Sequence, residues 1–184
     1  RRDEREQALD HFESGCRLAS RFNAPIVNIV APWARELEGP TSYLPRYYEV
    51  ASGAPQTKFH IDIADGFDWD LVWNGFVETV KACVARAKAH GLKFTIENHT
   101  HTLLPDTGSM LRLWDAIRDP ALGFNLDAGW IQLNREYAPL AIHKLKGHLL
   151  HLHLRDIDGL MRSFSPIGLG VMDFPAIAQA LRQT

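Results

Sequence analysis

The sequence lacks the features of a membrane protein and of a nucleic-acid-binding protein. Its longest mainly apolar stretch lies around residues 26–30, far short of the ~20 residues that a membrane-spanning helix needs. Its 20 basic and 22 acidic residues form no long run of either sign, whereas a nucleic-acid-binding surface usually carries a clustered basic face. We therefore expect neither a membrane nor a nucleic acid as a partner.

Cysteine is also scarce, since Cys16 and Cys83 are the only two and lie far apart in the sequence. A disulfide framework or a thiolate zinc site needs more cysteines at closer spacing. We predict that both are small buried residues in a reducing compartment. No signal peptide is recognisable after Arg1, so a cytoplasmic location is the default expectation.

What the sequence does contain is an alternation of short apolar segments with longer segments of helical period. The helical spacing of apolar side chains predicts helices over residues 3–22, 70–90, 109–118, 135–146 and 174–182. Short β-branched or apolar runs predict strands over residues 25–31, 92–97, 122–127 and 149–155. Such alternation is typical of an α/β fold with a parallel sheet.

The remaining long segment, residues 32–68, carries four prolines and three glycines and shows no extended period. We predict a loop there, with a short hairpin around residues 59–63. Loops of this length are uncommon within domains and often cover functional sites. No linker or internal repeat interrupts the chain, so we expect one domain over residues 1–184.

Polar and apolar side chains alternate along three of the predicted strands, and the polar face is unusual. The apolar members, which we expect to pack on helices, are Phe94, Ile96, Phe124, Leu126, Leu150, Leu152 and Leu154. The polar members are Thr95, Glu97, Asn125, Asp127, His151, His153 and Arg155. Imidazole and guanidinium groups are costly to bury unless they are paired or bound. In a (β/α)8 barrel this second face is the interior, and the C-terminal strand ends carry the catalytic residues.

Three of these polar residues, Glu97, Asp127 and His153, stand at or near the ends of consecutive predicted strands. Two carboxylates and an imidazole that converge on one rim suit a hard or borderline divalent cation. We predict that the three residues bind one such ion. Taken alone, Asp127 would be more readily explained as a helix N-cap, and His151 could equally be a hydrogen-bonded packing residue.

Four segments between Lys93 and Leu181 resemble, in order, motifs of the xylose isomerase-like superfamily of TIM barrels, which includes sugar epimerases, hydroxypyruvate isomerase, inosose dehydratase and endonuclease IV. Residues 96–99 (Ile-Glu-Asn-His) resemble the Glu-Asn-His segment that follows the fifth strand. Residues 125–129 (Asn-Leu-Asp-Ala-Gly) resemble the sixth-strand Asp motif, and residues 153–156 (His-Leu-Arg-Asp) the seventh-strand His-x-Lys-Asp motif. Residues 166–174 resemble the Gly-x-Gly turn and Asp-Phe helix start that come next.

This resemblance implies a (β/α)8 TIM barrel of which the chain supplies about strands four to seven with their helices. The first three strands, and an eighth-strand Glu that usually completes the family's metal site, would lie outside this sequence. We therefore expect a fragment of a longer protein. Trp130 stands where many relatives have a His, and its indole offers a metal no lone pair. This argues against a trinuclear zinc nuclease and against a close analogy with ketose 3-epimerases.

The activity implied by the resemblance is a divalent-metal-dependent isomerase or epimerase acting on a sugar, keto-sugar or cyclitol. Proton transfer would proceed through an enediolate, with Glu97 as both metal ligand and base. Manganese is the first expectation for the ion, with magnesium, cobalt and zinc as alternatives. The alternative functions are a metal-dependent lyase (a dehydratase or β-eliminase of an oxidised sugar or glycoside) and a non-catalytic sugar-binding barrel subunit.

We expect a small carbohydrate as the partner, and we leave open whether the protein is a homo-oligomer. The predicted substrate contacts are His151, Arg155, Asp156, Trp33, Trp130 and His99. His151, Arg155 and Asp156 could instead support the metal ligands through hydrogen bonds. Plain packing is an equal alternative for the two tryptophans, and a surface-loop role is an equal alternative for His99 and for the nearby His101.

Overall fold

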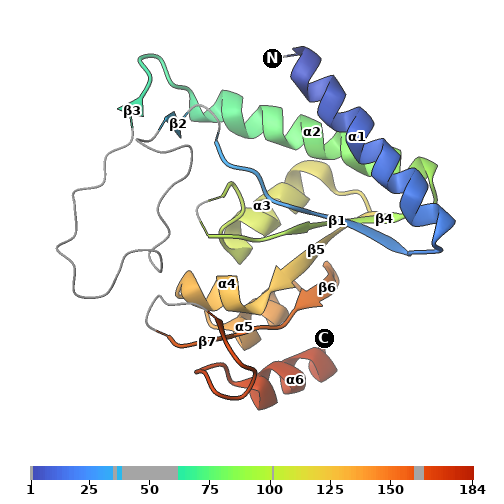
Figure 1. Cartoon of the computed structure of the whole chain (residues 1–184). Coiled ribbons are helices and arrows are strands. Elements are labelled where there is room, and N and C mark those ends of the chain that lie inside the picture. Colours follow the sequence, from blue (N-terminus) through green and yellow to red (C-terminus); the bar gives the residue numbers. More distant parts are fainter. Residues whose placement is uncertain (1, 35–36, 39–61, 101, 160–163) are drawn as a thin grey trace.

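A four-stranded parallel sheet lies at the centre of the protein (Figure 1). The computed structural model describes residues 2–34, 37–38, 62–100, 102–159 and 164–184. The strands are β1 (Ile26–Val30), β4 (Lys93–Glu97), β5 (Leu122–Asp127) and β6 (Leu149–His153), and they lie side by side in this order. Because all four run parallel, their C-terminal ends meet at one edge of the sheet.

Helices connect and cover these strands, which confirms the predicted α/β alternation. The helices in the described ranges are α1 (Arg2–Arg21), α2 (Trp69–Ala89), α3 (Thr107–Ile117), α4 (Ala128–Leu133), α5 (Ala138–Lys144) and α6 (Phe174–Gln183). Helix α2 illustrates why the sequence folds this way, since the Asp68 carboxylate accepts hydrogen bonds from the backbone N–H groups of Asp70 and Leu71 and so starts the helix. Gly91, at φ +72°, adopts the left-handed conformation just beyond its end.

The hydrophobic core lies between the sheet and the helices. Four side chains of β4 and β5 are fully buried and face the helices: Phe94, Ile96, Phe124 and Leu126. Burial of each contributes roughly 1.5–3 kcal/mol to folding. Cys16 and Cys83 belong to the same core as free thiols, as predicted, and burial raises the pKa of Cys83 to about 11.

Two short antiparallel ladders accompany the main sheet. Strand β2 (Leu37–Glu38) pairs with β3 (Asp62–Ile63), and β7 (Asp156–Ile157) pairs with β8 (Phe164–Ser165). Residues 39–61 lie outside the described part of the chain, so the short hairpin predicted around residues 59–63 stays a prediction. No helix in the described ranges is both long enough and apolar enough to cross a membrane.

The helix predicted over residues 135–146 is confirmed as the shorter α5 (Ala138–Lys144), whereas α4 (Ala128–Leu133), which precedes it, was not predicted. Helix α4 begins directly after Asp127, which caps it, and ends at Leu133. Arg135, at φ +65°, takes a left-handed conformation that interrupts the helical path. Helix α5 then starts after Tyr137 with a proline in its first turn.

The predicted leucine face of β6 is also corrected by the structure. The pairing register with β5 shifts between Phe124 and Asn125, so Leu149 rather than Leu150 lies opposite Phe124 and packs on the core. Leu150 lies against Gly123 and is 37% exposed. Of the three leucines expected on the helix-facing side, Leu152 alone packs there, and Leu154 is 47% exposed. The shift reverses which side of the strand its first residues face.

Candidate metal centre

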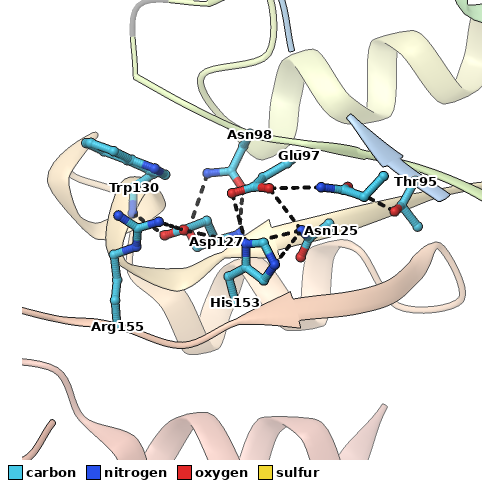
Figure 2. Close-up of polar contacts among 9 residues, drawn as sticks. Thr95, Glu97, Asn98, Asn125, Asp127, Trp130, His153 and Arg155 are labelled. Atoms are coloured by element: carbon cyan, nitrogen blue, oxygen red, sulfur yellow. Dashed lines mark hydrogen bonds and ion pairs between the residues drawn. The ribbon is translucent and has the colours of Figure 1, made fainter. Parts of the chain in front are cut away.

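The C-terminal ends of β4, β5 and β6 bring Glu97, Asp127 and His153 together (Figure 2). Asp127 pairs with His153 in the β5–β6 register, and Glu97 pairs with Asn125 one strand pair away. One ligand atom from each of the three residues lies within 4.8 Å of the other two. His153 Nδ1 is 3.0 Å from Glu97 Oε1 and 4.0 Å from Asp127 Oδ2. The fold thus gathers the three residues that the strand pattern predicted.

Glu97 is a buried carboxylate that hydrogen bonds hold from one side. Its Oε2 accepts hydrogen bonds from Asn28 Nδ2 at 3.0 Å and from Asn125 Nδ2 at 3.1 Å. Asn28 is oriented in turn by Thr95, whose hydroxyl donates to its side-chain oxygen. The two amide donors fix the plane of the carboxylate and leave Oε1 directed at His153.

Asp127 is fully buried and has a partner on each carboxylate oxygen. Oδ1 accepts the backbone N–H of Trp130 at 2.9 Å, which makes Asp127 the N-cap of α4, and Oδ2 lies 2.5 Å from Arg155 Nη2. Burial raises the pKa of Asp127, and the charge of Glu97 adds to this effect, while the Trp130 N–H and Arg155 oppose it. Asn98 fixes the backbone of Asp127, accepting its N–H at 2.8 Å.

The donor set fits a divalent cation. Two carboxylates and one imidazole are ligands that magnesium, manganese and zinc accept in different proportions. The carboxylates form a buried floor, while the His153 side chain is 42% exposed, so the cluster is open on the His153 side. Two buried carboxylates this close together repel each other unless a cation lies beside them. The cluster could therefore hold one divalent metal ion.

Three predicted substrate-contact residues form a stack beside the cluster. The rings of His99 and Trp130 lie 3.9 Å apart between centroids. The guanidinium carbon of Arg155 lies 4.9 Å from the centroid of the Trp130 ring, and Figure 2 shows these two side chains next to each other. Trp130 is 3% exposed, so in this arrangement no ring face is open to a sugar. Stacking of Trp130 on a substrate stays a prediction, and the structure gives this side chain a packing role.

The remaining predicted contacts are spread more widely. His151 lies on the exposed inner side of β6, with its ring 5.2 Å from that of His153. Trp33 is partly buried just after β1. His101 lies outside the described residues. Substrate binding by these residues stays a prediction.

Asp156 is a buried anchor for the loop that follows β8. Its Oδ2 accepts the backbone N–H groups of Gly168 and Gly170, both at 2.9 Å, and its Oδ1 accepts those of Ile157 and Met172. Burial raises the pKa of Asp156, but the four N–H donors together bring it below the ordinary value. With both oxygens engaged, Asp156 stabilises the loop, and its predicted contact with substrate stays a prediction.

We expect Asp156→Asn to lower the free energy of unfolding by about 2–4 kcal/mol, because the new amide nitrogen cannot accept the N–H groups that face it. The lowered folded-state pKa means that ionised Asp156 stabilises the protein above its unfolded pKa of about 3.9, and that this stability is lost as the pH falls through the folded value. The variant should therefore lose less stability than the wild type on acidification below about pH 4.

Urea unfolding at pH 7 and at about pH 3 measures both effects. Asp115→Asn is the matched control, because Asp115 forms an exposed ion pair with Arg118. A variant at position 156 as stable as the control at pH 7 would contradict the anchoring role.

Three residues of the centre were not singled out from the sequence: Asn28, Asn98 and Gly129. Asn28 is a polar residue within an otherwise apolar strand, and that is the signal that could have identified it. Asn98 belongs to the Glu-Asn-His motif, but the motif does not show that its side chain accepts the backbone N–H of Asp127. Gly129 leaves room for the Arg155 side chain, since a Cβ at this position would overlap Arg155 Cγ and Cδ.

The model of a family described as "Xylose isomerase-like TIM barrel" matches residues 1–184. Comparison with curated protein sequences found no match.

Several solved structures share the fold at low sequence identity. A D-tagatose 3-epimerase-like protein superposes with a TM-score of 0.70 at 17% identity, over 97% of this chain and 59% of its own. A probable 3-DHS dehydratase from Bacillus anthracis superposes with a TM-score of 0.71 at 17% identity, over 97% of this chain and 61% of its own. A xylose isomerase-like TIM barrel protein from Mycobacterium smegmatis was solved in complex with magnesium. It superposes with a TM-score of 0.68 at 19% identity, over 96% of this chain and 57% of its own. The chain thus forms a partial TIM barrel that spans about three fifths of these proteins.

Proposed function

The chain belongs to the xylose isomerase-like TIM barrel family, and from this premise we propose that it acts as a divalent-metal-dependent isomerase or epimerase on a sugar, keto-sugar or cyclitol. Residues 1–184 would then all belong to a single barrel domain, and they would supply strands four to seven of that barrel. Glu97, Asp127 and His153 would hold the ion, with manganese first and magnesium, cobalt or zinc as alternatives. The observation that carries the proposal is the convergence of these three side chains from three neighbouring strands.

A bound divalent cation would polarise a substrate carbonyl and make the neighbouring C–H group more acidic. Glu97 would accept the proton from that carbon, because its carboxylate stands at the floor of the open cluster with Oε1 turned to the same side as His153. Asn28 and Asn125 would keep this carboxylate in one orientation throughout. Return of the proton to the other face or to the adjacent carbon would give epimerisation or isomerisation.

Other side chains around the cluster would bind and orient the substrate. His151 lies on β6 and Arg155 follows this strand, and both can donate hydrogen bonds, while His99 stacks on Trp130 beside the cluster. A sugar presents several hydroxyl groups, so donors on more than one side would hold it in a single orientation. Trp33 and Trp130 are further candidates for this set.

A metal-dependent lyase is the second candidate, and one specific observation favours it. Trp130 occupies the position at which a His could have served as a second ligand or substrate contact, and Trp130 is buried rather than presented to the cluster. One structural neighbour is described as a probable dehydratase. The same metal centre could remove a proton next to a carbonyl and expel a leaving group from the next carbon.

Incubating the intact, manganese-loaded protein with a panel of ketoses and oxidised glycosides in deuterated water distinguishes these functions. We expect deuterium to enter the carbon next to the carbonyl without loss of water, because the abstracted proton exchanges with solvent. Mass spectrometry detects this incorporation. A lyase would instead release an unsaturated product that absorbs in the near ultraviolet.

A protein that binds manganese and sugar but gives neither product would be a non-catalytic sugar-binding subunit, which would contradict the proposal. The experiment includes Glu97→Gln as a control for background exchange, since this variant lacks the proposed base.

A further inference from the structure

Arg155 occupies the oxygen through which Asp127 faces the rest of the cluster. Its Nη2 atom lies 2.5 Å from Asp127 Oδ2, and the same oxygen is the one directed at His153 Nδ1, 4.0 Å away. The other oxygen, Oδ1, accepts the N–H of Trp130 and belongs to the helix cap. A guanidinium group and a metal ion would therefore compete for one carboxylate oxygen (Figure 2).

Because Asp127 is buried, its carboxylate needs a neighbouring positive charge both with and without a bound metal ion. Asp127 is fully buried, and an unpaired carboxylate at such a position is strongly destabilising. Arg155 supplies the positive charge in the structure described here. A divalent cation between Asp127 and His153 would supply it instead, and two cations at one carboxylate oxygen repel each other. The two arrangements are alternatives for the same negative charge.

The sequence provides space for this arginine at one specific position. The side-chain stem of Arg155 passes over Gly129 in the first turn of α4, where any Cβ would overlap Arg155 Cγ and Cδ. The guanidinium also lies over the Trp130 ring, at 4.9 Å from its centroid. Trp130 can keep this planar cation nearby after it leaves Asp127.

We propose that Arg155 is an exchangeable counter-ion of the metal centre: it pairs with Asp127 in the metal-free protein and is displaced from Oδ2 when the ion binds. This inference rests on the proposed function, because it requires the cluster to bind a metal. Displacement frees the guanidinium to donate hydrogen bonds to substrate oxygens. Metal binding would thus precede and promote substrate binding, and Arg155 acts as a positioning residue that links the two events.

If Arg155 and the metal ion exchange at Asp127, removing the Arg155 guanidinium should strengthen metal binding. We expect Arg155→Gln to lower the dissociation constant of manganese by about tenfold, within the usual range of coupling between two sites. Gly129→Ala should act in the same direction, because the new methyl group pushes the Arg155 stem aside while the positive charge remains on the chain. Isothermal titration calorimetry of the intact protein with manganese alone measures both constants.

Arg118→Gln is the matched control, since Arg118 pairs with Asp115 on the surface at the opposite end of the sheet and should leave the constant unchanged. Tighter binding in both Arg155→Gln and Gly129→Ala supports the exchange. Tighter binding in Arg155→Gln alone overturns it, because the charge rather than the pairing at Oδ2 would then oppose the metal. If Arg155→Gln does not fold, the manganese dissociation constant of Gly129→Ala still tests the exchange.

Two further outcomes separate this inference from the proposed function. Manganese binding to the wild type with unchanged or weaker binding in both variants overturns the exchange and leaves the metal centre standing. No manganese binding to any of the proteins overturns both. A crystal structure of the manganese-bound protein provides a second readout, and an intact Arg155–Asp127 pair in it would also overturn the exchange.

Discussion

Replacing His153 with alanine is expected to weaken manganese binding by more than about a hundredfold. His153 supplies the nitrogen donor of the cluster, and even residues that only support metal ligands typically cost 10–100-fold in affinity when they are removed. Alanine leaves two carboxylates with no neutral donor opposite them, and it takes away a side chain that is 42% exposed, so the fold should persist. Isothermal titration calorimetry of the intact protein measures the change.

His151→Ala is the matched control, because it removes the same kind of side chain from the same strand. The two rings lie 5.2 Å apart, and His151 is not part of the predicted ligand set. We expect manganese affinity within about twofold of the wild type in this variant. Equal losses in the two variants would show that the imidazoles of β6 act together or only structurally, and would contradict the assignment of His153 as a ligand.

The second large effect is expected for Glu97→Gln, which should reduce deuterium incorporation into substrate by about a thousandfold, in the range usual for removal of a general base. The amide is nearly the same size as the carboxylate but cannot take up a proton from carbon. Its carbonyl oxygen can still accept the hydrogen bonds from Asn28 and Asn125, so the side chain should stay in place. The measurement is made at saturating manganese, because the variant also loses a charged ligand.

Glu97→Gln should differ from a structural defect in one respect. Its free energy of unfolding should remain within about 1 kcal/mol of the wild type, since burying an amide costs no more than burying a carboxylate. A variant that retains wild-type exchange at saturating manganese would exclude Glu97 as the base. The proton would then have to be accepted by another group of the cluster.

The alternation of strands and helices, and the family, could be predicted from the sequence because each depends on local periodicity or on short motifs. The four main strands and the ends of α1, α2, α3 and α6 fall close to the predicted ranges. The metal cluster could be predicted for a related reason: polar residues at the ends of consecutive parallel strands converge, whatever the details of packing. The prediction of Glu97, Asp127 and His153 combined that rule with the ligand preferences of divalent cations.

The features that were missed depend on local detail that periodicity does not encode. The register shift beside Asn125 reverses the side of β6 on which Leu150 lies, and strict alternation gives no sign of it. Asp127 caps α4, so the residue that is predicted to bind the metal also has the N-cap role that was its alternative explanation. The two roles fall on different oxygens of the Asp127 carboxylate: Oδ1 caps the helix, and Oδ2 faces His153.

The pairing of Arg155 with Asp127 was missed for a different reason. The alternation placed both residues on the inner face, but which of two neighbouring carboxylates a guanidinium pairs with depends on the path of its side chain. That path is open only because residue 129 is glycine. Asp156 is a similar case, since its four backbone donors come from segments whose positions are fixed only by the folded loop.

The metal content of the intact protein, purified without chelator and dialysed against manganese, tests the central claim most directly. Mass spectrometry of the bound metal should give about one equivalent per chain in the wild type, and almost none in Asp127→Asn and His153→Ala. A wild-type protein that holds no manganese, magnesium, cobalt or zinc after each has been offered would contradict the metal centre, and with it both the isomerase and the lyase.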